Sequence, residues 1–507
     1  MTTLLYITAF IGGLVTLSLE LAAARLLAPA FGTSELVWSA IIGLILLYLA
    51  AGYELGGKWA DRSPRPVTLY TIVLSAGIAI GTLPFLSRPI LRLATAGMSA
   101  WNLGLVAGPF VVVLILFAIP VTLLACISPF IIRLAMSDVR ASGITAGRIY
   151  AISTLGSFLG TFLPNLLLIP LWGTRRTFLL LALLAALLGA VGLWHSDRRR
   201  FWYLSWVLPL LLILLLLPPG AIKPQAGLIH EEESTYNLIQ VVENEAGVRF
   251  LLLNEGQGIH SIYAPQQTLT GGAWDYFLAA PYFNPPPYPP EQVDNLLVIG
   301  SAAGTIPAQY TAIYGDLPID GVEIDPAIVA VGRRYFEMHQ PGLRVHIADG
   351  RSYLQQTETR YAVVAVDAYR LPYIPWHLTT QEFFQEIKAH LTEEGVVAIN
   401  VGHTPDDWRL VEALVTTMST VYPSIHVISV PNTFNAIVIA TVQPTDPANL
   451  ADNLVQIEDR RLRAAVQSAQ SNLVPVAPGG TVFTDDQAPV ELLTDALVLR
   501  HLLGVTP

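Results

Sequence analysis

Long apolar runs dominate the first 220 residues and restrict this part of the chain to a bundle of membrane-spanning helices. A helix needs about 20 apolar residues to cross roughly 30 Å of hydrocarbon, and a backbone in lipid must satisfy its own hydrogen bonds. Seven runs are long enough, and they lie at residues 4–28, 36–57, 67–87, 104–127, 147–171, 177–194 and 201–219. We therefore predict a multi-pass α-helical membrane domain over residues 1–220 with about seven helices, which makes the lipid bilayer a partner.

The charges of the chain divide at the same place. Residues 1–220 contain 14 Lys and Arg against 6 Asp and Glu, whereas the remaining residues contain 14 basic against 32 acidic side chains. Such asymmetry predicts two parts with different surroundings. An acidic soluble half disfavours nucleic acid as a partner, because nucleic acid attracts basic surfaces. It suits a cationic small molecule, although many soluble domains are acidic for other reasons.

A few charges fall inside the apolar runs. Glu20 and Arg25 lie in the first run, while Glu54 and Lys58 are four residues apart at the end of the second and hence share a helix face. Charges in the bilayer are costly and often functional. Two interpretations remain open here, a polar pocket between helices and a structural ion pair.

After Pro218-Pro219-Gly220 the pattern changes to that of a soluble α/β protein. Residues 236–243 and 248–254 are rich in β-branched and aromatic residues, which predicts a small β-hairpin domain over 226–280. From residue 291 onward, strand-like and helical runs alternate, which predicts a Rossmann-like domain with a doubly wound parallel sheet. Its predicted strands are 296–300, 319–325, 343–348, 361–367, 395–401, 425–430 and 436–441.

Small or acidic residues end the first four predicted strands of this sheet. Gly300, Ala302 and Gly304 form a small-residue loop that opens a helix, whose free N–H groups suit a ligand. Glu323 ends the second strand, Asp349-Gly350 the third and Asp367 the fourth. Any one acid alone could be a helix cap. Together at the carboxyl edge of one sheet, they predict a nucleotide site.

These motifs resemble spermidine synthases, the polyamine aminopropyltransferases, in the form that bacteria fuse to a membrane domain. The resemblance rests on segments 253–257, 322–325, 349–351, 367–369 and 377–384, and covers about 230–440 in outline. It implies a class I S-adenosylmethionine-type fold that includes the small β domain. In the N-terminal part, residues 57–65 and 147–175 resemble half of a major-facilitator transporter. Half a transporter is not expected to transport by rocking two repeats.

The resemblance assigns roles to individual residues. It implies that Glu323 holds the ribose of the donor, that Asp349 contacts the adenine amine, and that Asp367 helps to deprotonate the attacking amine. Further cofactor contacts are implied at Gln257, Gly300, Ala302, Gly304 and Gly350. The acceptor amine is expected near the segment Trp274-Asp275-Tyr276, chiefly at Asp275 and Tyr276, and near Tyr369. Asp485 and Asp486 are acids that reach the cleft or, alternatively, belong to a loop before a helix cap. No metal is expected.

Two positions depart from the family pattern. Where the family has an Asp that binds the aminopropyl amine, this chain has Ala302-Ala303, and where it has a second Asp after the one matching Asp367, this chain has Arg370. Both changes remove an anion that would hold a cationic amine. The acceptor is therefore expected to differ from putrescine, or the donor to be S-adenosylmethionine itself, or the site to be degenerate.

Three functions follow as hypotheses. The first is a membrane-anchored aminopropyltransferase that uses decarboxylated S-adenosylmethionine and a small amine acceptor. The second is an S-adenosylmethionine-dependent methyltransferase acting on a membrane-associated substrate, and the third is a non-catalytic nucleoside-binding membrane protein. The sequence carries no indication of an oligomeric state.

The expected location is the cell (inner) membrane, with the soluble domain in the cytoplasm where the donor is made. The distribution of Lys and Arg residues conflicts with a cytoplasmic position of the soluble domain. Loops 58–65, 133–148 and 195–200 hold nine Lys and Arg residues, which the positive-inside rule places in the cytoplasm together with the N-terminus. Seven crossings would then put the soluble domain on the other side. Either the last run, 201–219, does not cross, or the count is off by one, or the inferred cofactor is wrong; an incorrect count is the interpretation we favour.

Overall fold

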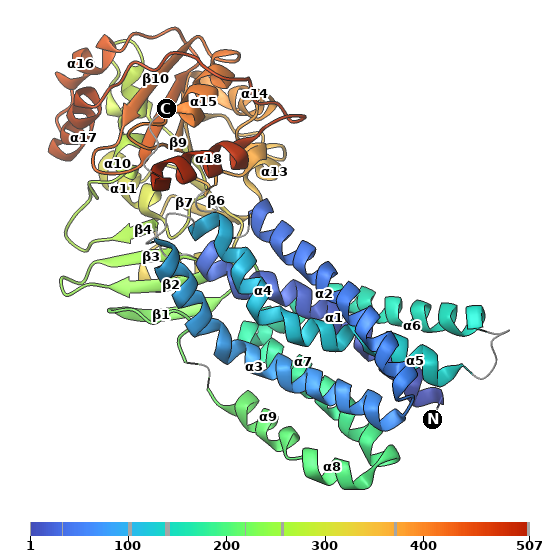
Figure 1. Cartoon of the computed structure of the whole chain (residues 1–507). Helices are drawn as coiled ribbons and strands as arrows, with labels where there is room; N and C mark the ends of the chain where they lie inside the picture. Colours follow the sequence, from blue (N-terminus) through green and yellow to red (C-terminus); the bar gives the residue numbers. More distant parts are fainter. Residues whose placement is uncertain are drawn as a thin grey trace. The chain divides into compact units, whose positions relative to one another are not determined.

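The chain divides into two compact units in the computed structural model, which describes residues 2–32, 34–99, 104–136, 142–218, 220–254, 258–369 and 373–503 (Figure 1). The helical unit comprises Met1–Pro224 and Glu233–Leu238, and the α/β unit comprises Gln225–Glu232 and Ile239–Pro507. The division at Pro224 lies close to the boundary expected at residue 220. A short excursion of the chain, the tip of a β-hairpin, belongs to the helical unit.

Helices account for nearly all of the helical unit. They are α1 (Thr2–Phe31), α2 (Glu35–Arg62), α3 (Pro66–Ser99), α4 (Gly104–Ala125), α5 (Ile127–Ala135), α6 (Ser142–Leu163), α7 (Ile169–Ser196), α8 (Arg198–Leu204) and α9 (Val207–Leu216). Among the described residues, six helical stretches are long and apolar enough to cross a membrane. The fifth and sixth predicted spans form one of them, Ser142–Ser196.

That stretch is too long to be a single crossing. Its 55 residues would extend about 80 Å as a straight helix, far more than a hydrocarbon core. It contains a π-helical segment, Pro164–Leu168, and a break at Gly173, whose φ of 78° and ψ of 167° are not helical. The parts also pack differently, because α6 lies against α1 and α7 against α3. About seven helical segments were predicted, and six stretches are counted because the two predicted spans on either side of that break form one continuous stretch.

Glycines allow close contact between α1 and α6. A Cβ atom added at Gly156 would lie 1.9 Å from the Phe10 carbonyl oxygen, and one at Gly160 would lie 2.3 Å from the Leu14 carbonyl oxygen. Ser18 Oγ donates to the Gly160 carbonyl oxygen at 3.0 Å. Small residues and short polar contacts are the usual means of joining helices in lipid, where apolar burial drives little association.

The tip of the first β-hairpin, residues 233–238, has polar partners in the helical unit. Glu233 accepts hydrogen bonds from the Thr174 amide at 2.7 Å and its hydroxyl at 2.5 Å, so it caps the helix that restarts after Gly173. Arg25 donates to the carbonyl oxygens of Ser234 and Tyr236. Of the charges noted in the apolar runs, Arg25 thus has a structural partner, and Lys58 pairs with Glu54 at 2.5 Å.

The α/β unit begins with a four-stranded sheet in the order β1-β2-β3-β4. Its strands are β1 (Leu228–Glu233), β2 (Leu238–Glu243), β3 (Arg249–Leu253) and β4 (Ile259–Tyr263). The sequence predicted only β2 and β3. The strand β1 has the composition Leu-Ile-His-Glu-Glu-Glu, in which charge hides the strand pattern. Ile239, Val241 and Leu251 of this sheet pack against the helix α12 (Pro326–Tyr335).

The second sheet has seven strands in the order β10-β11-β9-β8-β5-β6-β7. They are β5 (Leu296–Ile299), β6 (Ile319–Glu323), β7 (Leu343–Ile347), β8 (Tyr361–Val366), β9 (Leu391–Gly402), β10 (Ser424–Ser429) and β11 (Asn435–Thr441). The pairs among β5 to β9 are parallel, but β11 runs antiparallel to both of its neighbours. The prediction of a wholly parallel sheet is therefore wrong for β11. Only residues 430–434 join it to β10, too few for the crossover that parallel strands need.

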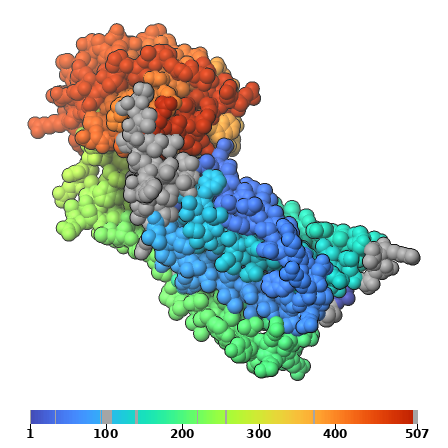
Figure 2. Space-filling view, viewed as in Figure 1, coloured from blue at the N-terminus to red at the C-terminus, as the bar shows by residue number. Residues whose placement is uncertain are grey.

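Helices cover both faces of this sheet. One face carries α10 (Trp274–Phe277), α11 (Thr305–Tyr314), α16 (Ala448–Leu454) and α17 (Arg460–Ser471), and the other α13 (Gly350–Leu354), α14 (Gln381–Ala389), α15 (Arg409–Ser419) and α18 (Val490–Leu503). Figure 2 shows the orange-to-red part of the chain, after about residue 350, packed into one body. The hydrophobic core on the face that carries α10 includes three fully buried aromatic residues, Phe277, Tyr282 and Phe283. The end of the predicted 226–280 β domain is thus part of the core of the large sheet.

Candidate functional site

The candidate site is formed where β8, β5, β6 and β7, four neighbours in the sheet, end side by side. The loop after β5 makes this possible. Gly300 has a φ of 85°, and a Cβ atom there would lie 2.6 Å from the carbonyl oxygen of Asp367. Only glycine allows the ends of β5 and β8 to come this close. Gly304, with a φ of 92°, then starts α11. That Gly300 and Gly304 contact a cofactor stays a prediction.

Glu323 ends β6 and is 7% exposed. Its Oε2 accepts a hydrogen bond from the Ala302 amide at 3.0 Å, and its Oε1 accepts one from the Asp325 amide at 3.0 Å. Burial raises the pKa of this carboxyl to about 7, although the amide donors oppose the shift. Glu323 therefore braces the loop after β5 and keeps lone pairs for a hydroxylated ligand.

An exposed apolar side chain stands beside this carboxylate. Ile324, the next residue, leaves 42% of its surface open. Ile347 is the register partner of Glu323 on β7 and is also exposed. Apolar surface next to the Glu323 carboxyl suits a planar base. The sequence analysis did not single out either residue.

Asp349 has three hydrogen-bond donors and caps α13. Its Oδ1 accepts from the amides of Arg351 at 3.1 Å and Ser352 at 3.0 Å, and its Oδ2 lies 2.9 Å from His377 Nε2. The His377 hydrogen bond lowers the pKa of this carboxyl to about 2. Gly350 follows without room for a side chain, because a Cβ atom would lie 2.3 Å from Ile299 Cγ2. Asp349 is thus both a helix cap and an anion paired with His377.

Asp367 directly follows β8 and is partly buried. Its Oδ2 accepts from Trp274 Nε1 and its Oδ1 from Asn400 Nδ2, both at 2.9 Å. Burial raises the pKa of Asp367 to about 6, and the two donors moderate that rise. Tyr369 donates from its hydroxyl to the Asn400 carbonyl oxygen at 3.0 Å, and burial raises its pKa well above the ordinary value. Tyr369 therefore stays protonated in the same network.

The predicted acceptor residues Asp275 and Tyr276 have other partners. Asp275 accepts four hydrogen bonds, from the Thr270 amide and hydroxyl at 2.8 and 2.9 Å, the Gly271 amide at 2.8 Å and Gln309 Nε2 at 2.6 Å. Tyr276 pairs its hydroxyl with Ser468 Oγ at 2.9 Å. It is the residue before them, Trp274, that reaches Asp367.

The two C-terminal acids lie near the Asp349 loop. Asp485 accepts from both terminal nitrogens of Arg351, at 2.7 and 2.8 Å, and from the Thr380 hydroxyl at 2.7 Å. Arg351 also binds Glu386 at 2.8 Å. Asp486 is exposed. The predicted cofactor residue Gln257 and the departure at Arg370 lie outside the described residues.

Among the residues that sequence reasoning missed, Asn400 and His377 had a signal in the sequence. Asn400 lies near the end of β9, so the rule that ligand residues follow strand ends would have included it. His377 stands in one of the motifs that carried the resemblance. Trp274 belongs to the segment that the resemblance placed near the amine, but its contact with Asp367 could not be read from the sequence.

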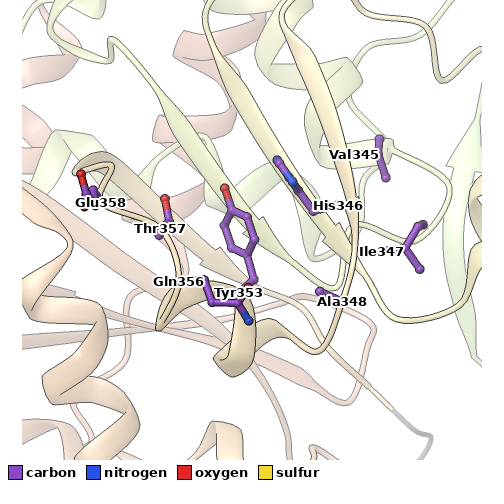
Figure 3. Close-up of a pocket in the computed structure, with 8 residues that line it drawn as sticks. All are labelled: Val345, His346, Ile347, Ala348, Tyr353, Gln356, Thr357 and Glu358. Atoms are coloured by element: carbon purple, nitrogen blue, oxygen red, sulfur yellow. The ribbon is translucent and has the colours of Figure 1, made fainter.

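A separate pocket opens along the edge strand β7 and is lined by Val345, His346, Ile347, Ala348, Tyr353, Gln356, Thr357 and Glu358 (Figure 3). The His346 and Tyr353 rings lie on one side of β7, and Val345 and Ile347 on the other. Of the polar lining residues, His346 pairs with Asp320, which also accepts from the Tyr361 hydroxyl, each at 2.8 Å. Within the described part of the chain, no three His, Cys, Asp or Glu side chains are grouped to hold a metal ion.

Part of the chain is similar to known transferases. The sequence profile of the Spermine/spermidine synthase domain matches residues 295–453. A probable polyamine aminopropyl transferase of Bifidobacterium longum is 30% identical over 287 residues, which are 53% of this chain and 63% of that relative. A polyamine aminopropyltransferase of Vibrio vulnificus is 29% identical over 314 residues, which are 59% of this chain and 98% of the relative. Human eEF1A lysine and N-terminal methyltransferase is 29% identical over 162 residues, 29% of this chain and 23% of the relative.

A solved structure of a probable spermidine synthase from Corynebacterium glutamicum aligns with a TM-score of 0.40 at 17% identity, over 51% of this chain and 99% of that chain. The α/β unit has a mixed seven-stranded sheet, and residues 295–453 within it match the Spermine/spermidine synthase domain. The profile match does not extend to the helical unit.

Proposed function

We propose that the α/β unit is an aminopropyltransferase, which moves an aminopropyl group from decarboxylated S-adenosylmethionine to an amine acceptor. The observation that carries the proposal is the Asp367 carboxylate, which is partly buried, held by two neutral donors and shifted to a pKa of about 6. The profile match to residues 295–453 and the names of the two bacterial relatives support the same reaction.

The donor nucleoside is assigned to the ends of β6 and β7. Glu323 binds the ribose hydroxyls with its free lone pairs, and Ile324 covers one face of the base. Asp349 accepts from the exocyclic amine of adenine and shares its carboxylate with His377. At Gly300, Gly304 and Gly350, a side chain would collide with Asp367, Met338 and Ile299 respectively, so glycine preserves the backbone of this edge. These contacts supply positioning, which is the main requirement when a charged sulfonium reacts.

The acceptor amine is assigned to Asp367. In the reaction, the nitrogen lone pair forms a bond to the carbon beside the sulfonium sulfur. The carbon–sulfur bond breaks, and its electrons neutralise the sulfur to give methylthioadenosine. The proton that the nitrogen loses passes to Asp367, whose pKa near 6 keeps it ionised at neutral pH and still able to accept the proton.

The acceptor is proposed to differ from putrescine. The Ala302 amide is bound to Glu323, and neither Ala302 nor Ala303 offers a carboxylate for a distal ammonium. Asp275 is occupied by four hydrogen bonds, and Asp485 by Arg351. A small amine with one charged end fits these observations better than a diamine with two.

The helical unit is proposed to anchor the enzyme in the cell membrane as a multi-pass protein. Six helical stretches have sufficient length and apolar character for this. The donor is made in the cytoplasm, so the α/β unit is proposed to face that side.

Product analysis tests the function. Purified full-length protein is incubated with a panel of mono- and diamines and with either decarboxylated S-adenosylmethionine or S-adenosylmethionine. Release of methylthioadenosine from the first donor supports the proposal. Formation of S-adenosylhomocysteine from the second establishes a methyltransferase instead, and binding of both donors without any product leaves a nucleoside-binding protein.

A further inference from the structure

Asn400 and Trp274 each donate to one oxygen of the Asp367 carboxylate, and both donors are neutral. The two distances are 2.9 Å. Burial and these two hydrogen bonds are the influences that act on the pKa of Asp367 among the described residues. A cationic donor would lower the pKa further and cancel the charge that attracts an ammonium. A pair of neutral donors instead orients the carboxylate and leaves its charge in place.

The orientation of the Asn400 amide follows from its partner. An ionised carboxylate only accepts hydrogen bonds, so the amide nitrogen must face Asp367. Asn400 is 7% exposed, and its backbone carbonyl accepts from the Tyr369 hydroxyl. Its Oδ1 is buried and has no partner within the described part of the chain. Side chain and backbone of Asn400 are thus tied to residues on the loop after β8.

Trp274 depends on a second buried acid. The four hydrogen bonds of Asp275 join residues 270 and 271 to Gln309 on α11. They determine the path of the chain just before α10, which begins at Trp274. Asp275 is 7% exposed and does not itself contact Asp367, and its role in holding this segment explains why the carboxylate is buried here.

We propose that Asn400 and Trp274 are positioning residues for Asp367, and that Asp275 acts on it through Trp274. The proposal rests on the proposed function only in taking Asp367 as the proton acceptor. The arrangement itself makes a prediction that needs no turnover: removing either donor destabilises the ionised carboxylate.

An infrared pH titration of the full-length protein in detergent tests this. The difference between the parent and Asp367→Asn isolates the carboxyl band of Asp367, and its midpoint in the parent is expected at about 6. In Trp274→Phe and in Asn400→Leu the midpoint should rise by about half to one pH unit, the equivalent of one neutral hydrogen bond. Asp275→Asn should raise it by less than Trp274→Phe.

The matched control is Trp202→Phe, which changes an exposed tryptophan of the helical unit and should leave the midpoint unchanged. Asn400→Ser replaces Asn400→Leu if the latter does not fold. An unshifted midpoint in either donor variant overturns the proposal, as does a parent in which Asp367 shows no titration near pH 6. A shifted midpoint in a protein that transfers no aminopropyl group contradicts the proposed function and leaves this inference standing.

Discussion

The indole Nε1 of Trp274 lies 2.9 Å from Oδ2 of Asp367, although 93 positions of sequence separate the two residues. Trp274 opens a short helix that follows the small β domain, and Asp367 directly follows the fourth strand in the chain order of the large sheet. The contact joins the part of the site assigned to the acceptor with a segment that the sequence analysis placed in a different domain.

Asp367→Asn keeps the size of the side chain and removes its charge. Turnover with decarboxylated S-adenosylmethionine should fall about 100-fold or more, in line with the loss of a general base. Donor affinity, measured by calorimetry with methylthioadenosine, should change little. Asp452→Asn on the exposed surface of α16 is the control and should be as active as the parent. Retained turnover together with lost donor affinity would show that Asp367 serves the cofactor instead.

Turnover by the parent should depend on pH through the same carboxylate. Burial raises the pKa of Asp367 to about 6, so the group is ionised above that pH and protonated below it. Because only the ionised form accepts a proton, kcat/KM should decline as the pH falls below about 6. A kcat/KM profile that stays flat from pH 5 to pH 8 would assign proton removal to another group.

Glu323→Ala should weaken the binding of methylthioadenosine by about 1–3 kcal/mol, the loss of charge-assisted hydrogen bonds to the ribose. Calorimetric titration measures this directly. Unchanged affinity would show that Glu323 does not bind the ribose.

Glu323 should also make stability depend on pH. Its folded pKa, about 7, is raised above the ordinary value of 4.5, so the folded protein binds the proton more tightly than the unfolded chain. The resulting stabilisation is fully present below about pH 4.5 and is lost as the pH rises through 7. Glu323→Gln cannot titrate, so the melting temperature of the parent should fall relative to that of Glu323→Gln across this range. Parallel curves would contradict the shift.

Gly300→Ala should destabilise the fold and disrupt the site. The new Cβ atom would meet the Asp367 carbonyl oxygen at 2.6 Å, and the φ of 85° disfavours alanine. Gly315→Ala is a matched control with a φ of 82° and no atom within 4 Å of its Cβ. Melting temperature should fall in both variants and further in Gly300→Ala, and only Gly300→Ala should lose nucleoside binding. An equal fall in melting temperature in the two variants would show that the positive φ alone, and not the contact with Asp367, causes the destabilisation.

Asp485→Asn removes one of the two acids that hold Arg351 and should loosen the Asp349 loop. We expect nucleoside affinity to fall by a few fold, because the pair is partly exposed and such pairs contribute about 1 kcal/mol or less. The neighbouring exposed acid provides the control, since Asp486→Asn should have no effect. Equal affinities in the two variants would remove any influence of Asp485 on the donor site.

The helical unit is expected to anchor the protein without transporting a substrate by itself. The full-length chain should stay with membranes after an alkaline wash, and liposomes containing it should take up no more putrescine or adenosine than empty ones. Saturable uptake that Glu20→Gln abolishes would overturn this expectation.

Local pattern in the sequence was sufficient for the membrane-like helices, the alternating strands and helices, and the acids that end β6, β7 and β8. Apolar length, strand composition and strand ends are properties of neighbouring residues, so they can be read along the chain. The same reasoning placed Glu323, Asp349 and Asp367 at one edge of the sheet because parallel strands end together.

Only the tertiary structure decided which side chains meet there. The antiparallel course of β11, the break at Gly173 and the tip of the first hairpin depend on packing between distant segments. The burial of residues 274–283 in the core of the large sheet brought Trp274, rather than Asp275 or Tyr276, to Asp367. Asp275 and Asp485 are acids by sequence, but their hydrogen-bond partners, Gln309 and Arg351, lie far away along the chain. A hydrogen bond depends on distance and direction in space, and neither is specified by the identity of a residue alone.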